Sequence, residues 1–148
     1  MLQSTLFQKF PAIHHGFTTK KDINGIPIDD LFTLQQIHST DVIELISNDM
    51  SFKADAVVTK KKQLAIGIKT SDCVPILLFD PKQKMIAAAH AGWKGSLGNI
   101  VKNTVEKMVA LGSKVTDIHA VIGPAISSCC YDVSIDRAMM FKDQFYFS

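Results

Sequence analysis

Residues 70–96 read TSDCVPILLFDPKQKMIAAAHAGWKGS, and this stretch decides how the chain folds. It contains two six-residue apolar runs, at 74–79 and 85–90, with the turn-like segment DPKQK between them. The pattern predicts a β-hairpin whose open end brings Cys73 and His90 together. If paired residue numbers sum to 163, these two side chains face each other directly, close enough to share one metal ion.

A helix is predicted directly downstream. Apolar residues recur at close to helical spacing over 97–111. The N-terminus of this helix would lie a few residues past His90, where free backbone N–H groups favour an anion such as phosphate, and Lys94 adds a positive charge. We expect Trp93 to be partly buried beside the same site, with Gly92 allowing a close backbone approach.

The rest of the chain predicts an α+β fold, a largely antiparallel mixed sheet flanked by helices, in a single domain over residues 1–148. Two strand-like runs, 54–59 and 64–69, flank three lysines and are interpreted as a hairpin with a solvated turn. Ser134 is expected to cap a last helix over 135–144. The remaining predicted strands are 16–19, 34–38, 42–46 and 118–122, the last of them buried.

Composition narrows the class of protein. Of the 148 residues, 47% are hydrophobic and 20% charged, and no apolar run approaches the roughly 18–20 residues of a transmembrane helix. The N-terminal residues lack the pattern of a secretion signal, so we expect a soluble, cytoplasmic protein. A net charge of +2 gives only a weak electrostatic field, so neither nucleic acid nor a membrane is expected as a partner. The oligomeric state is left open.

Three cysteines in such a chain argue against a disulfide framework. Cys129 and Cys130 are adjacent and lack the two-residue spacer of a CxxC pair, so they are interpreted as small buried packing residues. The third, Cys73, is a candidate functional residue because the predicted hairpin places it beside His90.

Two kinds of chemistry fit that pair. With His38, which precedes a turn, Cys73 and His90 would make a three-ligand zinc site with an open fourth position. Without a metal, Cys73 could instead be a nucleophile with His90 as its base, or a structural cysteine. Asp72 adjoins Cys73 and is a candidate for proton handling, with the cap of a strand end as the alternative role.

Six segments resemble, in the same order, the laccase-domain or YfiH-like family, also known as polyphenol oxidase or peptidoglycan editing factor: HGFTTK, QQIHSTDV, ADAVVT, TSDCVPILLFD, AAAHAGWKGS and IGPAISSCCYDV. The resemblance implies a purine nucleoside enzyme that cleaves adenosine, inosine, guanosine or methylthioadenosine with phosphate and also deaminates adenosine. It implies zinc held by His38, Cys73 and His90. Lys20 and Lys94 stand where relatives carry arginine and, with Trp93, are the candidates for substrate binding.

The resemblance leaves three other functions open. The editing-factor name implies a Cys/His-dependent amidase or hydrolase acting on peptidoglycan precursors. The older oxidase name implies copper, but five histidines without an HxH pair are few for a multicopper centre. Relatives continue well past residue 148, so the chain is expected to be incomplete at its C-terminus, and an inactive remnant is the third alternative.

Overall fold

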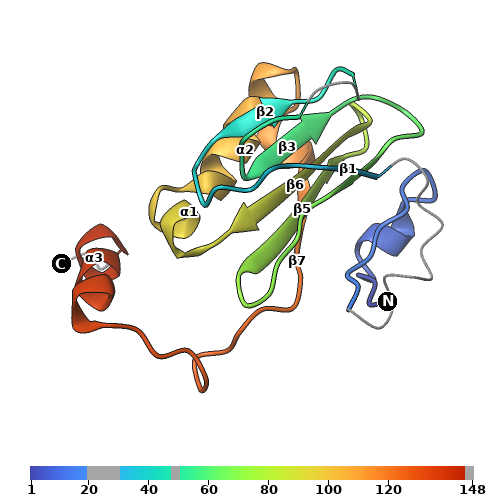
Figure 1. The fold of residues 1–148 in the computed structure, drawn as a ribbon. Helices are drawn as coiled ribbons and strands as arrows, with labels where there is room; N and C mark the ends of the chain where they lie inside the picture. Colours follow the sequence, from blue (N-terminus) through green and yellow to red (C-terminus); the bar gives the residue numbers. More distant parts are fainter. Residues whose placement is uncertain (20–30, 48–50, 146–148) are drawn as a thin grey trace.

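A five-stranded sheet forms the centre of the computed structural model, which describes residues 1–19, 31–47 and 51–145 (Figure 1). The strand order is β2–β3–β6–β5–β7, with β2 and β3 parallel and every other neighbouring pair antiparallel. The predicted α+β fold with a largely antiparallel mixed sheet is therefore confirmed. The strands are β2 (Val42–Glu44), β3 (Ala56–Thr59), β5 (Val74–Asp80), β6 (Met85–Ala91) and β7 (His119–Ile122).

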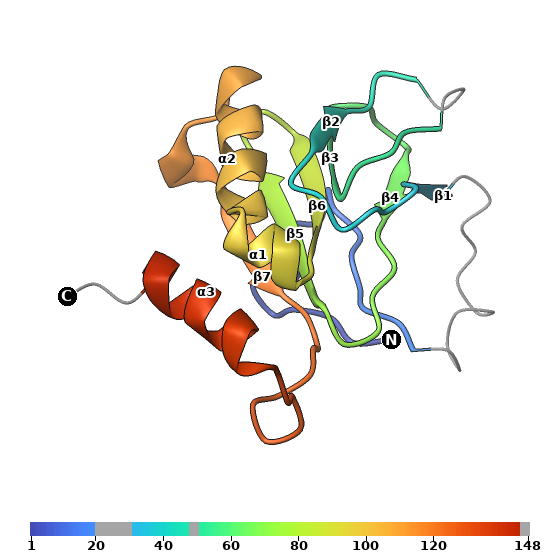
Figure 2. The same ribbon diagram turned by 60° about the vertical axis from the view of Figure 1, so that its left-hand side comes forward.

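The two faces of this sheet are covered differently (Figure 2). Helix α2 (Ile100–Ala110) packs on one face, and β1 (Leu31–Thr33) with β4 (Ala65–Gly67) forms a small parallel sheet on the other. Because side chains alternate along a strand, β3 is buried on both faces and serves both cores. The remaining elements are η1 (Phe7–Lys9), α1 (Trp93–Leu97), η3 (Val115–Asp117) and α3 (Ile135–Phe145).

The β5–β6 hairpin forms as predicted, but its register differs by two residues. Paired numbers sum to 165, so His90 pairs with Pro75 rather than with Cys73. The turn explains the difference, because one oxygen of the buried Asp80 carboxylate accepts hydrogen bonds from the backbone N–H groups of Lys82 and Gln83, at 2.8 and 3.0 Å. Lys82 and Gln83 therefore stay in the turn. Because side chains alternate along a strand, Cys73, two residues before Pro75, still lies on the same face of the hairpin as His90.

The predicted hairpin over 54–69 is wrong. Both edges of β3 are occupied by β2 and β6, so no edge is left for β4, which pairs with β1 instead. The strand predicted at 16–19 is reduced to a single bridge between Leu2 and Phe17. The last predicted strand exists as β7, but it is half-exposed rather than buried.

The helix predicted over 97–111 is interrupted. Asn99 has a φ of 61°, which ends helical geometry between α1 and α2, so the element directly after His90 is the five-residue α1. Helix α3 begins as predicted after Ser134, whose hydroxyl accepts a hydrogen bond from the Arg137 N–H at 3.4 Å. Within the described part of the chain, no helix combines the length and the apolar character needed to cross a membrane.

Candidate metal site

Three potential metal ligands converge at the open end of the β5–β6 hairpin. The ligand atoms of His38, Cys73 and His90 all lie within 4.8 Å of one another, and this is the one group of three or more such side chains among the described residues. His90 is buried at the end of β6, Cys73 is half-buried just before β5, and His38 is exposed in a bend after β1. The cluster is therefore held by the core on one side and open to solvent on the other.

Asp55, which the sequence reasoning missed, orients His90. Its side chain is fully buried, and its Oδ1 accepts a hydrogen bond from the Nδ1–H of His90 at 2.8 Å. Because a carboxylate only accepts hydrogen bonds, this contact selects the tautomer in which Nε2 of His90 carries the free lone pair. A carboxylate that bonds the rear nitrogen of a metal-binding histidine is a recurrent arrangement in metal sites.

The same carboxylate also fixes the backbone around His38. The N–H groups of Ile37, His38 and Ser39 donate to Asp55 at 3.1, 3.0 and 2.6 Å, and the Ser39 hydroxyl donates at 3.0 Å. These N–H groups bind a side chain rather than a neighbouring strand, so the strand predicted at 34–38 is reduced to a single bridge between Gln35 and Lys53. The wrapping also places His38 at a φ of 58°, an uncommon conformation for a residue with a side chain.

The pKa values of the Asp55 carboxyl and the Cys73 thiol are shifted in opposite directions. Burial by itself raises the pKa of the Asp55 carboxyl, but the hydrogen bonds from His90, Ser39 and Ile37 outweigh it and leave the pKa below its ordinary value. The pKa of the Cys73 thiol is raised, first by burial and then by the negative charges of Asp72 and Asp55. Asp55 is therefore anionic at neutral pH, while Cys73 retains its proton unless a cation replaces it.

Gly92 gives the three ligands the space they occupy. A Cβ atom at this position would lie 3.1 Å from Cδ2 of His38, 3.3 Å from Sγ of Cys73 and 3.5 Å from Cε1 of His90. The first two distances are tighter than nine in ten real Cβ contacts, so a side chain here would displace His38 and Cys73 by a few tenths of an ångström, whereas the contact with His90 is an ordinary one. The close backbone approach expected at Gly92 is present, and the atoms approached are those of the cluster itself.

The other described candidate residues, Trp93, Lys94 and Asp72, are not part of the group of metal ligands. Trp93 is half-buried, and the Cζ atom of Arg137, which the sequence reasoning missed, lies 4.5 Å from its ring centroid. Lys94 is exposed, with its Nζ 5.6 Å from the same centroid. Asp72 is also exposed and affects the site through its charge on Cys73. Lys20 lies outside the described residues.

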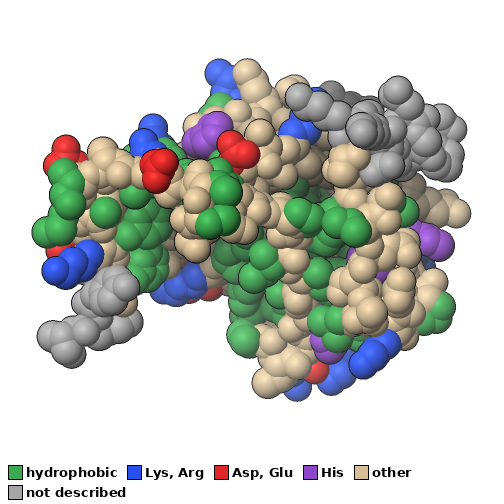
Figure 3. Space-filling view, turned by 90° about the horizontal axis from the view of Figure 1, so that it is seen from below, with side chains coloured by type: hydrophobic (Ala, Val, Ile, Leu, Met, Phe, Trp, Pro, Cys, Tyr) green, Lys and Arg blue, Asp and Glu red, His purple; other side chains and the backbone are tan. Residues whose placement is uncertain are grey.

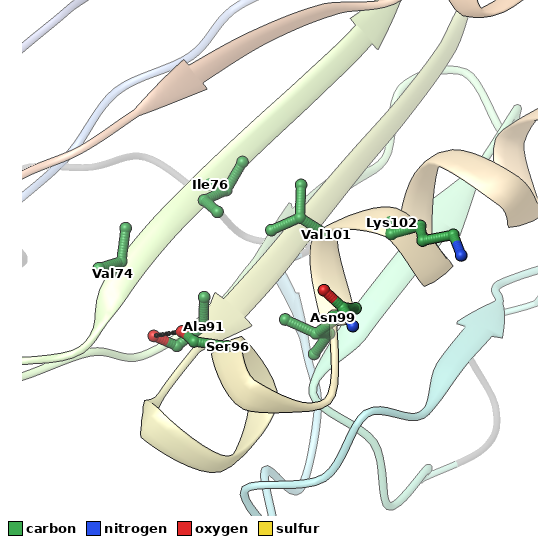
Figure 4. Close-up of a pocket in the computed structure, with 8 residues that line it drawn as sticks. Val74, Ile76, Ala91, Ser96, Asn99, Val101 and Lys102 are labelled. Atoms are coloured by element: carbon green, nitrogen blue, oxygen red, sulfur yellow. Dashed lines mark hydrogen bonds between the residues drawn. The ribbon is translucent and has the colours of Figure 1, made fainter. Parts of the chain in front are cut away.

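An open cavity of about 240 Å³ lies near these residues but on the other face of the hairpin (Figure 4). Val74 and Ala91, which line it, each directly follow a residue of the cluster, so alternation along the strands turns them towards α2. Ser96 at the same end donates a long hydrogen bond of 3.5 Å to the Ala91 carbonyl. The cavity is thus an apolar groove beside α2 and is not the pocket of the metal cluster.

Comparisons with known proteins place the chain in a family. The family described as multi-copper polyphenol oxidoreductase laccase matches residues 12–147, and the chain belongs to this family. Among solved structures, it resembles the hypothetical protein YfiH of Bacillus licheniformis, with a TM-score of 0.73 and 32% identity over 82% of this chain and 50% of that one.

Relatives at the sequence level have enzymatic names. The chain is 42% identical over 118 residues to a purine nucleoside phosphorylase of Deinococcus radiodurans, covering 80% of this chain and 46% of the relative. It is 37% identical over 131 residues to adenosine deaminase RL5 from an unknown prokaryotic organism, covering 80% and 49%. The chain therefore spans about half the length of the relatives that it matches.

Proposed function

We propose that this chain carries the zinc site of a purine nucleoside enzyme. The reactions would be phosphorolysis of adenosine, inosine, guanosine or methylthioadenosine, and deamination of adenosine. The observation that carries the proposal is the convergence of His38, Cys73 and His90 on one point, with Asp55 behind His90. The names of the relatives, purine nucleoside phosphorylase and adenosine deaminase, support the choice of substrate class.

The donor set fits zinc. One thiolate and two imidazoles are ligands that zinc favours, and in a tetrahedral site their donor atoms stand about 3.3–3.7 Å apart. The observed separations, all within 4.8 Å, need only a small contraction to reach that spacing. Three protein ligands leave a fourth position open, and the exposure of His38 lets a small molecule reach it from solvent.

Each residue around the cluster has a role in this proposal. Bound zinc supplies a Lewis acid that activates an oxygen nucleophile near neutral pH. Asp55 keeps the Nε2 lone pair of His90 directed at the cluster, and the exposed Asp72 would accept or deliver a proton. Trp93 offers a flat wall for the purine, while Lys94, together with Lys20, attracts phosphate.

The thiol-dependent amidase is the less favoured function. Fast turnover by a catalytic cysteine at neutral pH is favoured by a lowered pKa, whereas burial, Asp72 and Asp55 all raise that of Cys73. The Nδ1 of His90 is bonded to Asp55, which leaves the other nitrogen to act as the base or as a ligand. Proximity of Cys73 and His90 is common to both functions, but the raised pKa keeps the metal-free thiol protonated, which disfavours the thiolate nucleophile.

Metal analysis and enzyme assays would test the proposal together. Freshly purified chain should contain close to one zinc per molecule and little copper, and nucleoside incubated with phosphate should yield free base by chromatography. Cys73→Ser should lose the metal and the turnover together. Chelation should abolish turnover and expose Cys73 to alkylation, and readded zinc should restore both turnover and protection. Full turnover by chelated protein, confirmed free of metal, would instead favour the thiol enzyme.

A further inference from the structure

Cys129 and Cys130 do not pack in the core, contrary to the sequence interpretation. Both side chains are exposed, and their Sγ atoms lie 3.1 Å apart with the geometry of a thiol–thiol hydrogen bond. They sit in a turn closed by the Cys130 N–H, which donates to the Ser127 carbonyl at 3.0 Å. Burial therefore does not account for two adjacent thiols at this place.

The turn belongs to a connection that is fixed at both ends. The Gly123 N–H donates to the Pro75 carbonyl at 2.9 Å, and the Ile126 N–H donates to the Asp72 carbonyl at 3.0 Å. On the other side, Arg137 of α3 lies over the ring of Trp93. Figure 2 shows the turn projecting away from the sheet between β7 and α3. Figure 3 shows hydrophobic side chains beside charged ones on the α3 side of the molecule.

We propose that Cys129 and Cys130 form a vicinal dithiol that a low-molecular-weight disulfide oxidises reversibly. One thiolate attacks a sulfur of the small disulfide, forms a mixed disulfide and releases one small thiol. The neighbouring thiolate then attacks the cysteine sulfur of that mixed disulfide and releases the second small thiol. The small disulfide gains two electrons and takes up the two protons of the cysteines, which become joined by one S–S bond.

The geometry favours the second step. Two sulfur atoms 3.1 Å apart already stand at the separation of a near-attack arrangement, roughly 3–3.5 Å, so little further ordering is needed. Exposure lets the small disulfide approach either sulfur. Across a trans peptide, adjacent Cα atoms lie about 3.8 Å apart, below the usual 4.4–6.8 Å of a disulfide, so the product should be easily reduced. The site is thus suited to reversible modification rather than to structural cross-linking.

Mass spectrometry of the intact chain with excess glutathione disulfide tests this inference. In a Cys73→Ser background, which removes the third thiol, the chain should lose about 2 Da, and peptide mapping should place the bond at 129–130. Adding Cys129→Ser or Cys130→Ser should stop the reaction at a stable gain of about 305 Da, the mixed disulfide. Dithiothreitol should return every form to its starting mass.

Three results would overturn the inference: no mass change, a stable gain of two glutathione units without ring closure, or disulfide-linked dimers as the main product. Circular dichroism of each variant before oxidation verifies that the fold is intact. Neither zinc content nor nucleoside turnover enters the readout, so this inference and the proposed function can fail independently.

Discussion

Replacing Asp55 by asparagine is the sharpest test of how the site is built. The carboxylate accepts five hydrogen bonds, from Nδ1 of His90, from the Ser39 hydroxyl and from three consecutive backbone N–H groups. The amide has the same shape, but one of its two oxygens becomes an NH₂ group. Whichever way it turns, a donor then faces donors inside a fully buried site.

The cost follows from the hydrogen bonds that are lost. If the NH₂ replaces Oδ1, the His38 N–H loses its acceptor, and Nδ1 of His90 must become the acceptor. The proton of His90 then moves to Nε2, the nitrogen that would bind the metal. If the NH₂ replaces Oδ2 instead, the backbone N–H groups of Ile37 and Ser39 lose their acceptor. We expect Asp55→Asn to lower the free energy of unfolding by about 3 kcal/mol and the affinity for zinc roughly 10–100-fold.

Urea unfolding of chelated protein would measure the first effect, and competition with a chelating dye would measure the second. Asp80→Asn is the matched control, because Asp80 is also fully buried but lies at the opposite end of the same hairpin. It should lower the stability by about 1 kcal/mol and leave zinc affinity unchanged. Zinc affinity equal to the wild type in Asp55→Asn would refute the role assigned to this carboxylate.

Three further predictions concern other parts of the structure. Gly92→Ala should weaken zinc binding about tenfold, since its methyl group would crowd His38 and Cys73, while retaining the fold by circular dichroism. Lys60→Met should cost about 0.5 kcal/mol in urea unfolding, because the Lys60 ammonium donates to the Leu111 carbonyl at the end of α2, whereas exposed Lys62→Met should not. Burial raises the pKa of Asp80, but the nearby Ser113 hydroxyl and the hydrogen bonds from the Gln83 and Lys82 N–H groups outweigh it, so the pKa lies below its ordinary value. The stabilisation by Asp80 is therefore complete above the unfolded pKa of about 3.9 and is lost as pH falls through the lower folded value. Asp80→Asn should flatten this acid limb, and an identical pH dependence in both proteins would contradict the assignment.

The sequence determined the elements whose pattern is local. The β5–β6 hairpin follows from two apolar runs and a turn segment, and α3 follows from a serine cap and the residues after it. These signals depend on neighbours along the chain, so they can be read without knowing the fold. The hairpin also placed Cys73 and His90 together, while the choice of His38 and of zinc came from the family resemblance.

Only the tertiary structure decided how the strands pair and what holds the ligands. β3 lies between β2 and β6 and is buried on both faces, and both properties depend on elements far away in the sequence. Asp55 is separated from His90 by 35 residues and from the N–H groups it binds by 16–18, so no local pattern marks it as part of the site. A buried charge is stabilised by whichever hydrogen-bond donors lie near it in space, so the support that Asp55 gives to His90 and to the backbone around His38 is a property of the fold.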